Sequence, residues 1–218
     1  MTRQANPPHC FDEHNFAGWC KKLAAIDPVF KNILDQYGLP PMWTRPARFS
    51  TLVLTILEQQ VSLAAAMAAY RKLKNEIRWI TPERILAMSD EALRSCYFSR
   101  QKIQYVRILA QAIQTGELNL RSLHACSDEE VHRRLTIYKG IGDWTADIYM
   151  IHALRRADRF PLGDIALVNS MKESLQLGKE VERDFLLQRA EHWRPYRTIA
   201  AMMFWHAYIS KRKLTVEL

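Results

Sequence analysis

Hydrophobic positions along the chain recur at steps of three and four residues, which is the spacing of one face of an α-helix. The first such segment covers residues 12–27, and a shorter one follows from Asp27-Pro28 to Gly38. A strongly apolar segment covers residues 49–62. The same periodicity predicts further helices, of which the clearest cover residues 63–76, 102–115, 145–156 and 198–212. The pattern therefore predicts an all-α protein.

Small polar residues mark the starts of several of these helices. A side-chain oxygen of Ser62, Thr81, Ser89 or Ser127 can accept a backbone N–H of the first turn, and Pro82 suits a first helical position. Only seven of the 218 residues are glycine. Residues that favour helices are abundant, and the composition agrees with the periodicity.

One short segment between two predicted helices has a pattern of its own. Gly140 and Gly142 flank Ile141, and both glycines can adopt a positive φ and let another backbone approach closely. Asp143 is a candidate N-cap for a helix that begins near Trp144. The free N–H groups and positive dipole end of such a helix suit a phosphate. A plain turn between two core helices explains the same short pattern, so the glycines alone do not separate the two interpretations.

The charge balance is basic, with 31 Lys and Arg against 23 Asp and Glu and a formal net charge of +8. This balance is compatible with a polyanionic partner but does not by itself establish nucleic-acid binding. No apolar run reaches about 18 residues, the length that would span a membrane. The first ten residues lack the apolar centre of a secretory signal, so we expect an intracellular protein.

Cysteine and histidine give no sign of a metal centre. The four cysteines are scattered and include no C-x-x-C pair, which predicts reduced, mostly packed thiols and argues against an iron–sulfur cluster. The seven histidines show no ligand spacing such as H-E-x-x-H, so no catalytic metal is expected.

The stretch from residue 135 to 170 resembles the helix-hairpin-helix-Gly/Pro/Asp signature of base-excision DNA glycosylases. The resemblance rests on Tyr138-Lys139-Gly140-Ile141-Gly142, on Trp144, and on Pro161-Leu162-Gly163-Asp164. It extends roughly from Phe49 to His206. The most similar branch is 3-methyladenine DNA glycosylase II, because Trp144 stands where bifunctional relatives carry a catalytic Lys. Without that Lys no Schiff base forms, so the resemblance implies a monofunctional enzyme that uses water.

The resemblance implies a catalytic role for Asp164. Its carboxylate would stabilise the positive charge that develops on the sugar and would orient or deprotonate the attacking water. Trp144 and Trp205 would line the pocket and attract a cationic base, with Phe49 as pocket wall or core. The residues alone favour a simple N-cap for Asp164. The two roles are compatible, because a carboxylate near a helix N-terminus is held ionised.

Two further segments would contact DNA in this family. Gln59 and Gln60 lie in the motif ILEQQVS, which matches a turn that enters the minor groove. Gln60 would fill the gap left by the extruded nucleotide, where a relative carries an apolar wedge. Without the resemblance, the two glutamines are also explained by a polar helix end that faces solvent. Ser99 and Lys102 would lie near a phosphate, although the family's Gly, expected at the position of Phe98, is missing.

The hairpin itself would bind the DNA backbone, and such contacts position a protein without reading sequence. The residues that we expect to contact DNA there are Lys139, Gly140, Gly142, Asp143 and Thr145. By resemblance, three backbone carbonyls can also hold a Na⁺ or K⁺ ion that bridges to a phosphate: those of Thr136, Tyr138 and Ile141.

The prediction is a single all-α DNA glycosylase domain of two helical subdomains with a central cleft. Residues 1–50 and about 160–218 would form one subdomain, and residues 51–159 the other, with the hairpin at 136–146. The predicted function is monofunctional removal of alkylated purines, such as 3-methyladenine and 7-methylguanine, from double-stranded DNA by a monomer, after base flipping. Two alternatives stay open: a non-catalytic helix-hairpin-helix DNA-binding protein, and a glycosylase of the same superfamily for another lesion.

Overall fold

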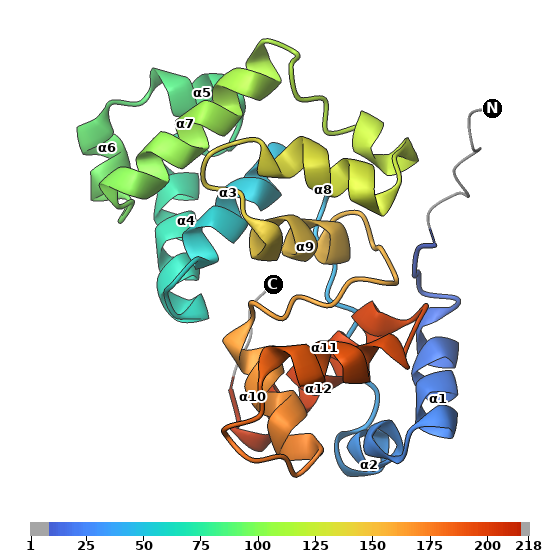
Figure 1. Cartoon of the computed structure of the whole chain (residues 1–218). Helices are drawn as coiled ribbons and strands as arrows, with labels where there is room; N and C mark the ends of the chain where they lie inside the picture. Colours follow the sequence, from blue (N-terminus) through green and yellow to red (C-terminus); the bar gives the residue numbers. More distant parts are fainter. Residues whose placement is uncertain (1–8, 215–218) are drawn as a thin grey trace, which may run out of the picture. The chain divides into compact units, whose positions relative to one another are not determined.

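The computed structural model describes residues 9–214, and helices joined by turns and loops make up this part of the chain (Figure 1). It contains no strand, only an isolated antiparallel bridge between Cys10 and Arg156. The all-α prediction is confirmed. The helices are α1 (Phe16–Ile26), α2 (Pro28–Tyr37), α3 (Phe49–Glu58), α4 (Leu63–Ile77), α5 (Pro82–Ala87), α6 (Asp90–Ser95), α7 (Arg100–Gln114), the 3₁₀ helix η1 (Ser122–Ala125), α8 (Asp128–Thr136), α9 (Asp143–His152), α10 (Ile165–Ser174), α11 (Arg183–Glu191) and α12 (Arg197–Lys211).

The described residues fall into two compact units. The internal unit comprises residues 45–149, and the terminal unit comprises residues 9–44 and 150–214. The boundary at 149/150 lies inside α9, so most of that helix belongs to the internal unit. Within residues 9–214 no helix is long and apolar enough to cross a membrane.

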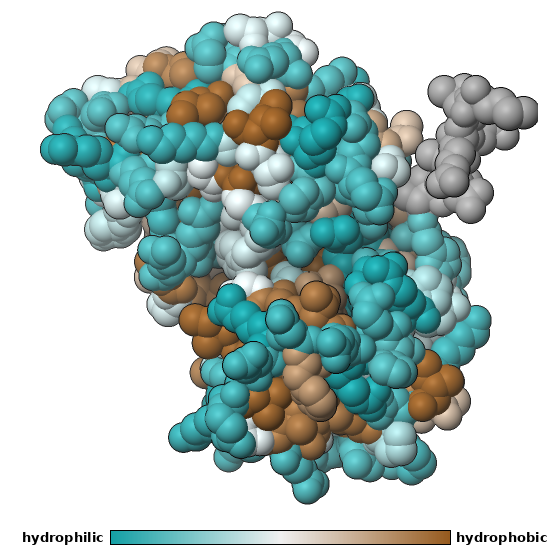
Figure 2. Space-filling model, viewed as in Figure 1, coloured by the Kyte–Doolittle hydropathy of each residue, from teal (hydrophilic) through white to brown (hydrophobic). Residues whose placement is uncertain are grey.

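The internal unit is built around α3. Every residue of this helix except Ser50 is buried, and Leu52, Val53 and Ile56 have no exposed surface. α3 packs against α4 and α7, and α5 and α6 pack against α7. The predicted caps are present: Ser62, for example, accepts a hydrogen bond from the backbone N–H of Ala65 over 3.2 Å. Hydrophilic residues cover most of the visible surface of this unit, with apolar residues in small separate areas (Figure 2).

The terminal unit is built around α12, whose residues from 197 to 205 are all buried. α12 packs against α1, α2 and α10. The rings of Phe30, Trp193 and Phe204 contact one another in the core. Burial raises the pKa of the Cys20 thiol to about 12. Cys96 is also buried and Cys126 is half-buried, while Cys10 is exposed, which agrees with the prediction of mostly packed thiols.

The turn at residues 155–159 is rich in charged residues, which is the composition of an ordinary solvated loop, but Arg156 is only 1% exposed. The carboxylate of Asp158 accepts hydrogen bonds from Arg197 of α12 over 2.8 and 3.0 Å. Thr198 donates to the carbonyl of Arg156 over 2.6 Å. Local sequence carries no sign of these partners, which lie about forty residues further along the chain. α9 also ends four residues earlier than predicted, and Arg155 has a φ of +56°.

Candidate functional site

The hairpin between α8 and α9 uses its two glycines differently. Gly140 has a φ of +98°, and a Cβ built there would lie 2.1 Å from the ring of Tyr105. The internal unit therefore requires glycine at this position. Gly142 could adopt a positive φ but does not, and a Cβ there would meet nothing within 4 Å. The fold of this unit does not require glycine at 142, so any such requirement comes from a partner that approaches from outside.

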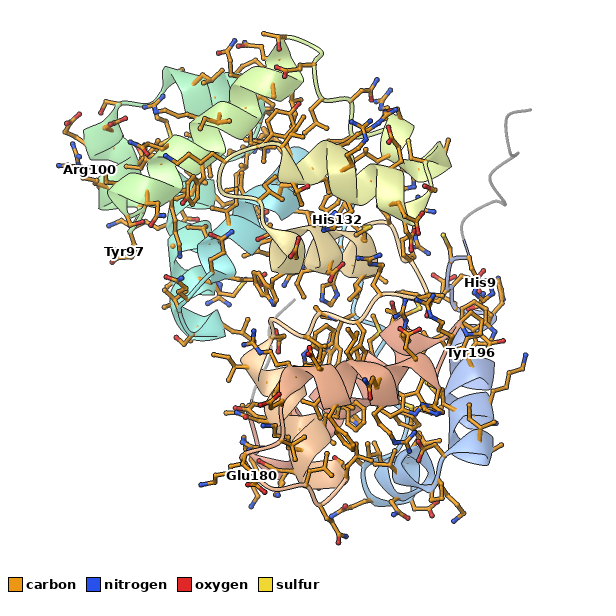
Figure 3. All side chains as sticks on the ribbon, viewed as in Figure 1. His9, Tyr97, Arg100, His132, Glu180 and Tyr196 are labelled. Carbon is orange, nitrogen blue, oxygen red and sulfur yellow. The ribbon has the colours of Figure 1, made fainter. Side chains whose placement is uncertain are left out.

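The start of α9 also differs from the prediction. The helix begins at Asp143, so this residue is its first member rather than the N-cap. The Asp143 carboxylate is 87% exposed and lies 2.9 Å from Nε2 of His132 on α8 (Figure 3). This pair links the two helices across the hairpin. Lys139 is exposed between them.

Gln59 connects the turn after α3 to the hairpin. Its Nε2 donates to the carbonyl of Gly140 over 2.8 Å and to the hydroxyl of Thr145 over 2.9 Å. Thr145 is buried, with 2% of its surface exposed. The side chain of Gln59 is therefore a structural link within the internal unit. Its predicted contact with DNA stays a prediction.

Gln60 has the opposite character. It is exposed and has a φ of +58° at the tip of the turn between α3 and α4. We call residues 59–62 the insertion turn. Gln59 anchors this turn, whereas Gln60 is exposed. A polar residue that faces solvent at a helix end therefore describes Gln60 but not Gln59.

Lys102 supports the insertion turn from the other side. Its Nζ donates to the carbonyls of Leu57 and Gln59 over 2.7 and 3.0 Å, at the C-terminal end of α3. A cation suits this negative end of the helix dipole. Partial burial lowers the pKa of Lys102. Ser99 is the N-cap of α7 and accepts from the Lys102 N–H over 3.2 Å. The predicted phosphate contacts of both residues stay predictions.

The turn before α7 contains a residue with a positive φ. Tyr97, which precedes the position at which we placed the family's glycine, has a φ of 65°. Phe98 is 3% exposed and packs in the core of the internal unit. In this turn a tyrosine therefore occupies the backbone conformation that favours glycine.

The terminal unit holds Asp164 in a defined orientation. Asp164 is the N-cap of α10, and its Oδ1 accepts from the backbone N–H of Leu167 over 2.8 Å. The same oxygen accepts from Nε1 of Trp205 over 3.1 Å. Asp164 is thus an N-cap, and its carboxylate also accepts a hydrogen bond from the indole of Trp205 on α12. The N-cap role and the predicted catalytic role are therefore compatible in geometry. The carboxylate is half-buried.

Trp205 is held in turn by a residue that sequence reasoning did not single out. The ring of His152 stacks on Trp205 with centroids 5.7 Å apart and an interplanar angle of 23°. Nδ1 of His152 lies 2.8 Å from the carbonyl oxygen of Trp43. These partners are 109 residues apart, and no local pattern could have indicated them. His152 therefore fixes the ring that binds Asp164.

The other two predicted pocket residues belong to the internal unit. Trp144 is half-buried in the first turn of α9. Phe49 is only 6% exposed at the start of α3 and packs in the core, which was the second of the two roles considered for it. The structure thus joins Gln59 with Gly140 and Thr145 in one unit, and Asp164 with Trp205 in the other.

These features match a known family. The model of the HhH-GPD superfamily of base excision DNA repair proteins matches residues 53–195, which contain the hairpin, the insertion turn and Asp164. The chain belongs to this superfamily.

Individual members support the same branch. DNA-3-methyladenine glycosylase 1 of Schizosaccharomyces pombe is 32% identical over 84% of this chain and 83% of its own length. A putative DNA-3-methyladenine glycosylase of Bacillus subtilis is 28% identical over 80% of this chain, which spans 64% of that relative. A solved structure of the S. pombe 3-methyladenine glycosylase in complex with abasic DNA superposes with a TM-score of 0.81 at 28% identity, covering 89% of this chain and 97% of that one. Within the superfamily, the chain lies in the 3-methyladenine DNA glycosylase branch.

The superfamily match includes both the hairpin and Asp164. The resemblance stated from the sequence is confirmed, as is the helix-hairpin-helix glycosylase fold. The superfamily match ends at residue 195, so Trp205 lies beyond it. The roles of single residues in DNA binding and catalysis do not follow from the match and are proposals.

Proposed function

We propose that the chain removes alkylated purines from double-stranded DNA by hydrolysis of the N-glycosidic bond, after the damaged nucleotide has turned out of the stack. The observation that carries this proposal is the carboxylate of Asp164, whose Oδ1 accepts two N–H donors, one from the N-terminus of α10 and one from Trp205. The names of the relatives support the substrate class, since they are 3-methyladenine glycosylases.

The chemistry follows from the charge of the substrate. A purine alkylated at N3 or N7 is cationic, so its bond to C1′ is weak and breaks with the electron pair leaving on the base. The sugar becomes an oxocarbenium ion, and the fixed negative charge of Asp164 stabilises it. The oxygen of a water then bonds to C1′, and the carboxylate accepts the proton that this water loses. General-base and electrostatic help of this kind contributes about 10²–10⁴ in rate.

Two tryptophans supply recognition in this proposal. An electron-rich indole attracts a cationic base by about 0.5–2 kcal/mol. Trp205 donates its N–H to Asp164, so the ring and the carboxylate move as one. Trp144 stands where a lyase would carry its amine, so the reaction ends at the abasic site. Recognition by charge gives broad specificity among alkylated purines.

The internal unit binds the DNA backbone. The first N–H groups of α9 lack partners within the helix and suit a phosphate oxygen. Gly142 leaves open space for that approach, and Lys139 adds a positive charge. Gln60 enters the stack when the nucleotide leaves, while Gln59 holds the turn to the hairpin. The chain works as a monomer inside the cell, on any sequence context.

The hairpin also suits a monovalent cation. Thr136 is the last residue of α8, and its carbonyl lacks an intrahelical partner. The carbonyl of Tyr138 accepts one hydrogen bond, from the N–H of Ile141, and keeps a second lone pair. With the carbonyl of Ile141 these form a neutral oxygen donor set, which fits Na⁺ or K⁺. Such an ion would neutralise part of the phosphate charge at the hairpin.

The test is base release from methylated duplex DNA. The purified chain should release 3-methyladenine and 7-methylguanine, identified by chromatography, and should leave abasic sites without strand cleavage. Asp164→Asn keeps an oxygen for the cap and for Trp205 but removes the charge, so release should slow by about 10²–10⁴. Asp184→Asn is the matched control, because it also removes a carboxylate from the first turn of a helix, α11, and should not slow release.

The same experiment separates the alternatives. A non-catalytic DNA-binding protein would bind duplex DNA but release no base, and Asp164→Asn would change nothing. A glycosylase for another lesion would release a base only from duplexes that carry that lesion. If Asp164→Asn released alkylated purines at the rate of the unchanged chain, the proposed role of Asp164 would be wrong.

A further inference from the structure

Tyr97 occupies a conformation that a residue with a Cβ adopts at a cost. Its φ is +65°, in the region that favours glycine. It stands between two buried residues, Cys96 and Phe98, yet is itself 65% exposed. The internal unit does not need this side chain for its core. An unfavourable backbone and an exposed ring together indicate that the ring serves an external partner.

The ring has a positively charged neighbour. Nζ of Lys72, on α4, lies 4.5 Å from the centroid of the Tyr97 ring. Lys72 is itself exposed. Figure 3 labels Tyr97 and Arg100 near the turn that joins α6 to α7, where Arg100 adds a further exposed cation. This surface therefore combines an aromatic ring with positive charge.

The ring also borders an apolar cavity of about 240 Å³. The cavity wall continues from Tyr97 to Ala69 and Ala65 on α4, and then to Val61 of the insertion turn. Val61 is 47% exposed and follows Gln60 directly in the chain. Tyr97 and the residue next to Gln60 thus line the same cavity.

We propose that Tyr97 and Lys72, with this cavity, form a second DNA contact that binds a nucleotide of the duplex next to the one extruded. The inference rests on the proposed function, because Gln60 must enter the duplex for its neighbours to reach DNA. A nucleotide offers a flat apolar base or sugar and an anionic phosphate. The ring and the cavity suit the base or sugar, and the ammonium group of Lys72 suits the phosphate. Gln60 then fills the gap, while Tyr97 supports the adjacent nucleotide.

The left-handed backbone makes Tyr97→Gly an informative variant. Glycine relieves the conformation, so the variant should melt at the same temperature as the unchanged chain or higher. Its affinity for a duplex with a central abasic site should nevertheless fall, by about five- to tenfold, because an aromatic contact with a base is lost. Tyr97→Phe keeps the ring and should bind within about twofold of the unchanged chain.

Lys72→Met tests the charged half of the contact. The logarithmic salt dependence of binding should fall by about one phosphate contact. Trp79→Ala is the matched control, because Trp79 is 59% exposed with the guanidinium of Arg78 5.6 Å from its ring. Trp79 follows the C-terminal end of α4, about 20 Å from the insertion turn at 1.5 Å per residue. Trp79→Ala should therefore leave the DNA affinity and its salt dependence unchanged.

Two results would overturn the inference: unchanged DNA affinity in Tyr97→Gly, or a lower melting temperature with an affinity loss that Trp79→Ala shares. Neither would affect the proposed function, which depends on base release by the unchanged chain. Conversely, a chain that binds duplex DNA and loses affinity with Tyr97→Gly, but releases no base, would keep the contact and refute the glycosylase activity. A 2-aminopurine placed on either side of the abasic site, in either strand, identifies the nucleotide that Tyr97 contacts.

Discussion

The indole N–H of Trp205 donates to Oδ1 of Asp164 over 3.1 Å, and the backbone N–H of Leu167 donates to the same oxygen over 2.8 Å. One donor comes from the core helix α12 and the other from the first turn of α10. Because His152 stacks on Trp205, the direction of the carboxylate depends on residues of three helices, all of them within the terminal unit. A charge held in this way needs no reorganisation when the sugar becomes cationic.

This relationship predicts the behaviour of Trp205→Phe. The variant keeps a ring against His152 but loses the N–H, so Asp164 is less well oriented. We expect base release under single-turnover conditions to slow about tenfold or more, because a hydrogen bond to a charged group contributes about 1.5–3 kcal/mol. Thermal unfolding should show a loss of less than about 2 kcal/mol, since the swap leaves only a partial void. An unchanged rate would show that the indole does not orient Asp164.

The adjacent glutamines should respond differently to the same substitution. Gln59→Ala leaves the Gly140 carbonyl and the Thr145 hydroxyl without their shared donor, so unfolding by urea should show a loss of about 1–3 kcal/mol. Gln60→Ala should change stability by no more than about 0.5 kcal/mol, because the side chain is exposed. Its defect should instead be weaker binding to abasic duplex DNA. Equal stability losses in the two variants would contradict this division of roles.

The two hairpin glycines form a second matched pair. Gly140→Ala places a Cβ against the Tyr105 ring at a positive φ, and we expect a loss of about 2–5 kcal/mol in the free energy of unfolding. Gly142→Ala meets open space and should cost about 1 kcal/mol or less.

The Gly142→Ala variant tests whether DNA comes close to the hairpin backbone. If a phosphate approaches position 142, the added methyl should weaken duplex binding about tenfold, which corresponds to about 1.4 kcal/mol. Fluorescence anisotropy with a labelled duplex measures this. Full affinity in a stable Gly142→Ala protein would place the phosphate elsewhere.

A pH dependence follows from Glu130 on α8. Hydrogen bonds and charge from Arg133 and Arg134 lower the pKa of this carboxyl to about 2. A carboxyl whose pKa is lower in the folded protein stabilises it above the unfolded pKa, and this contribution is lost as the pH falls through the folded pKa. The melting temperature of Glu130→Gln should therefore lie below that of the unchanged chain at pH 6, and the two should converge between about pH 4 and pH 2. A difference that is constant with pH would exclude this origin.

The sequence alone was sufficient for the helices, their caps and the family. Helical periodicity and caps such as Ser62 depend on residues three or four positions apart, so the local sequence is enough to predict them. The hairpin glycines, Trp144 and Asp164 lie within 36 consecutive residues, so their spacing can be recognised in the sequence without knowledge of the packing. The left-handed backbone at Tyr97 had no such local sign, because a glycine indicates that conformation in a sequence and a tyrosine does not.

Only the tertiary structure decided which of these side chains meet. Gln59 binds Gly140 across 81 positions of sequence, Trp205 binds Asp164 across 41, and His152 reaches Trp43 across 109. Such pairs depend on how helices pack, and the packing follows from burial summed over a whole unit rather than from any short pattern. For this reason the chain revealed by itself that it carries a glycosylase hairpin and a candidate carboxylate. The division of labour between Gln59 and Gln60, the anchoring of Asp164 and the exposed ring of Tyr97 became visible only in the folded protein.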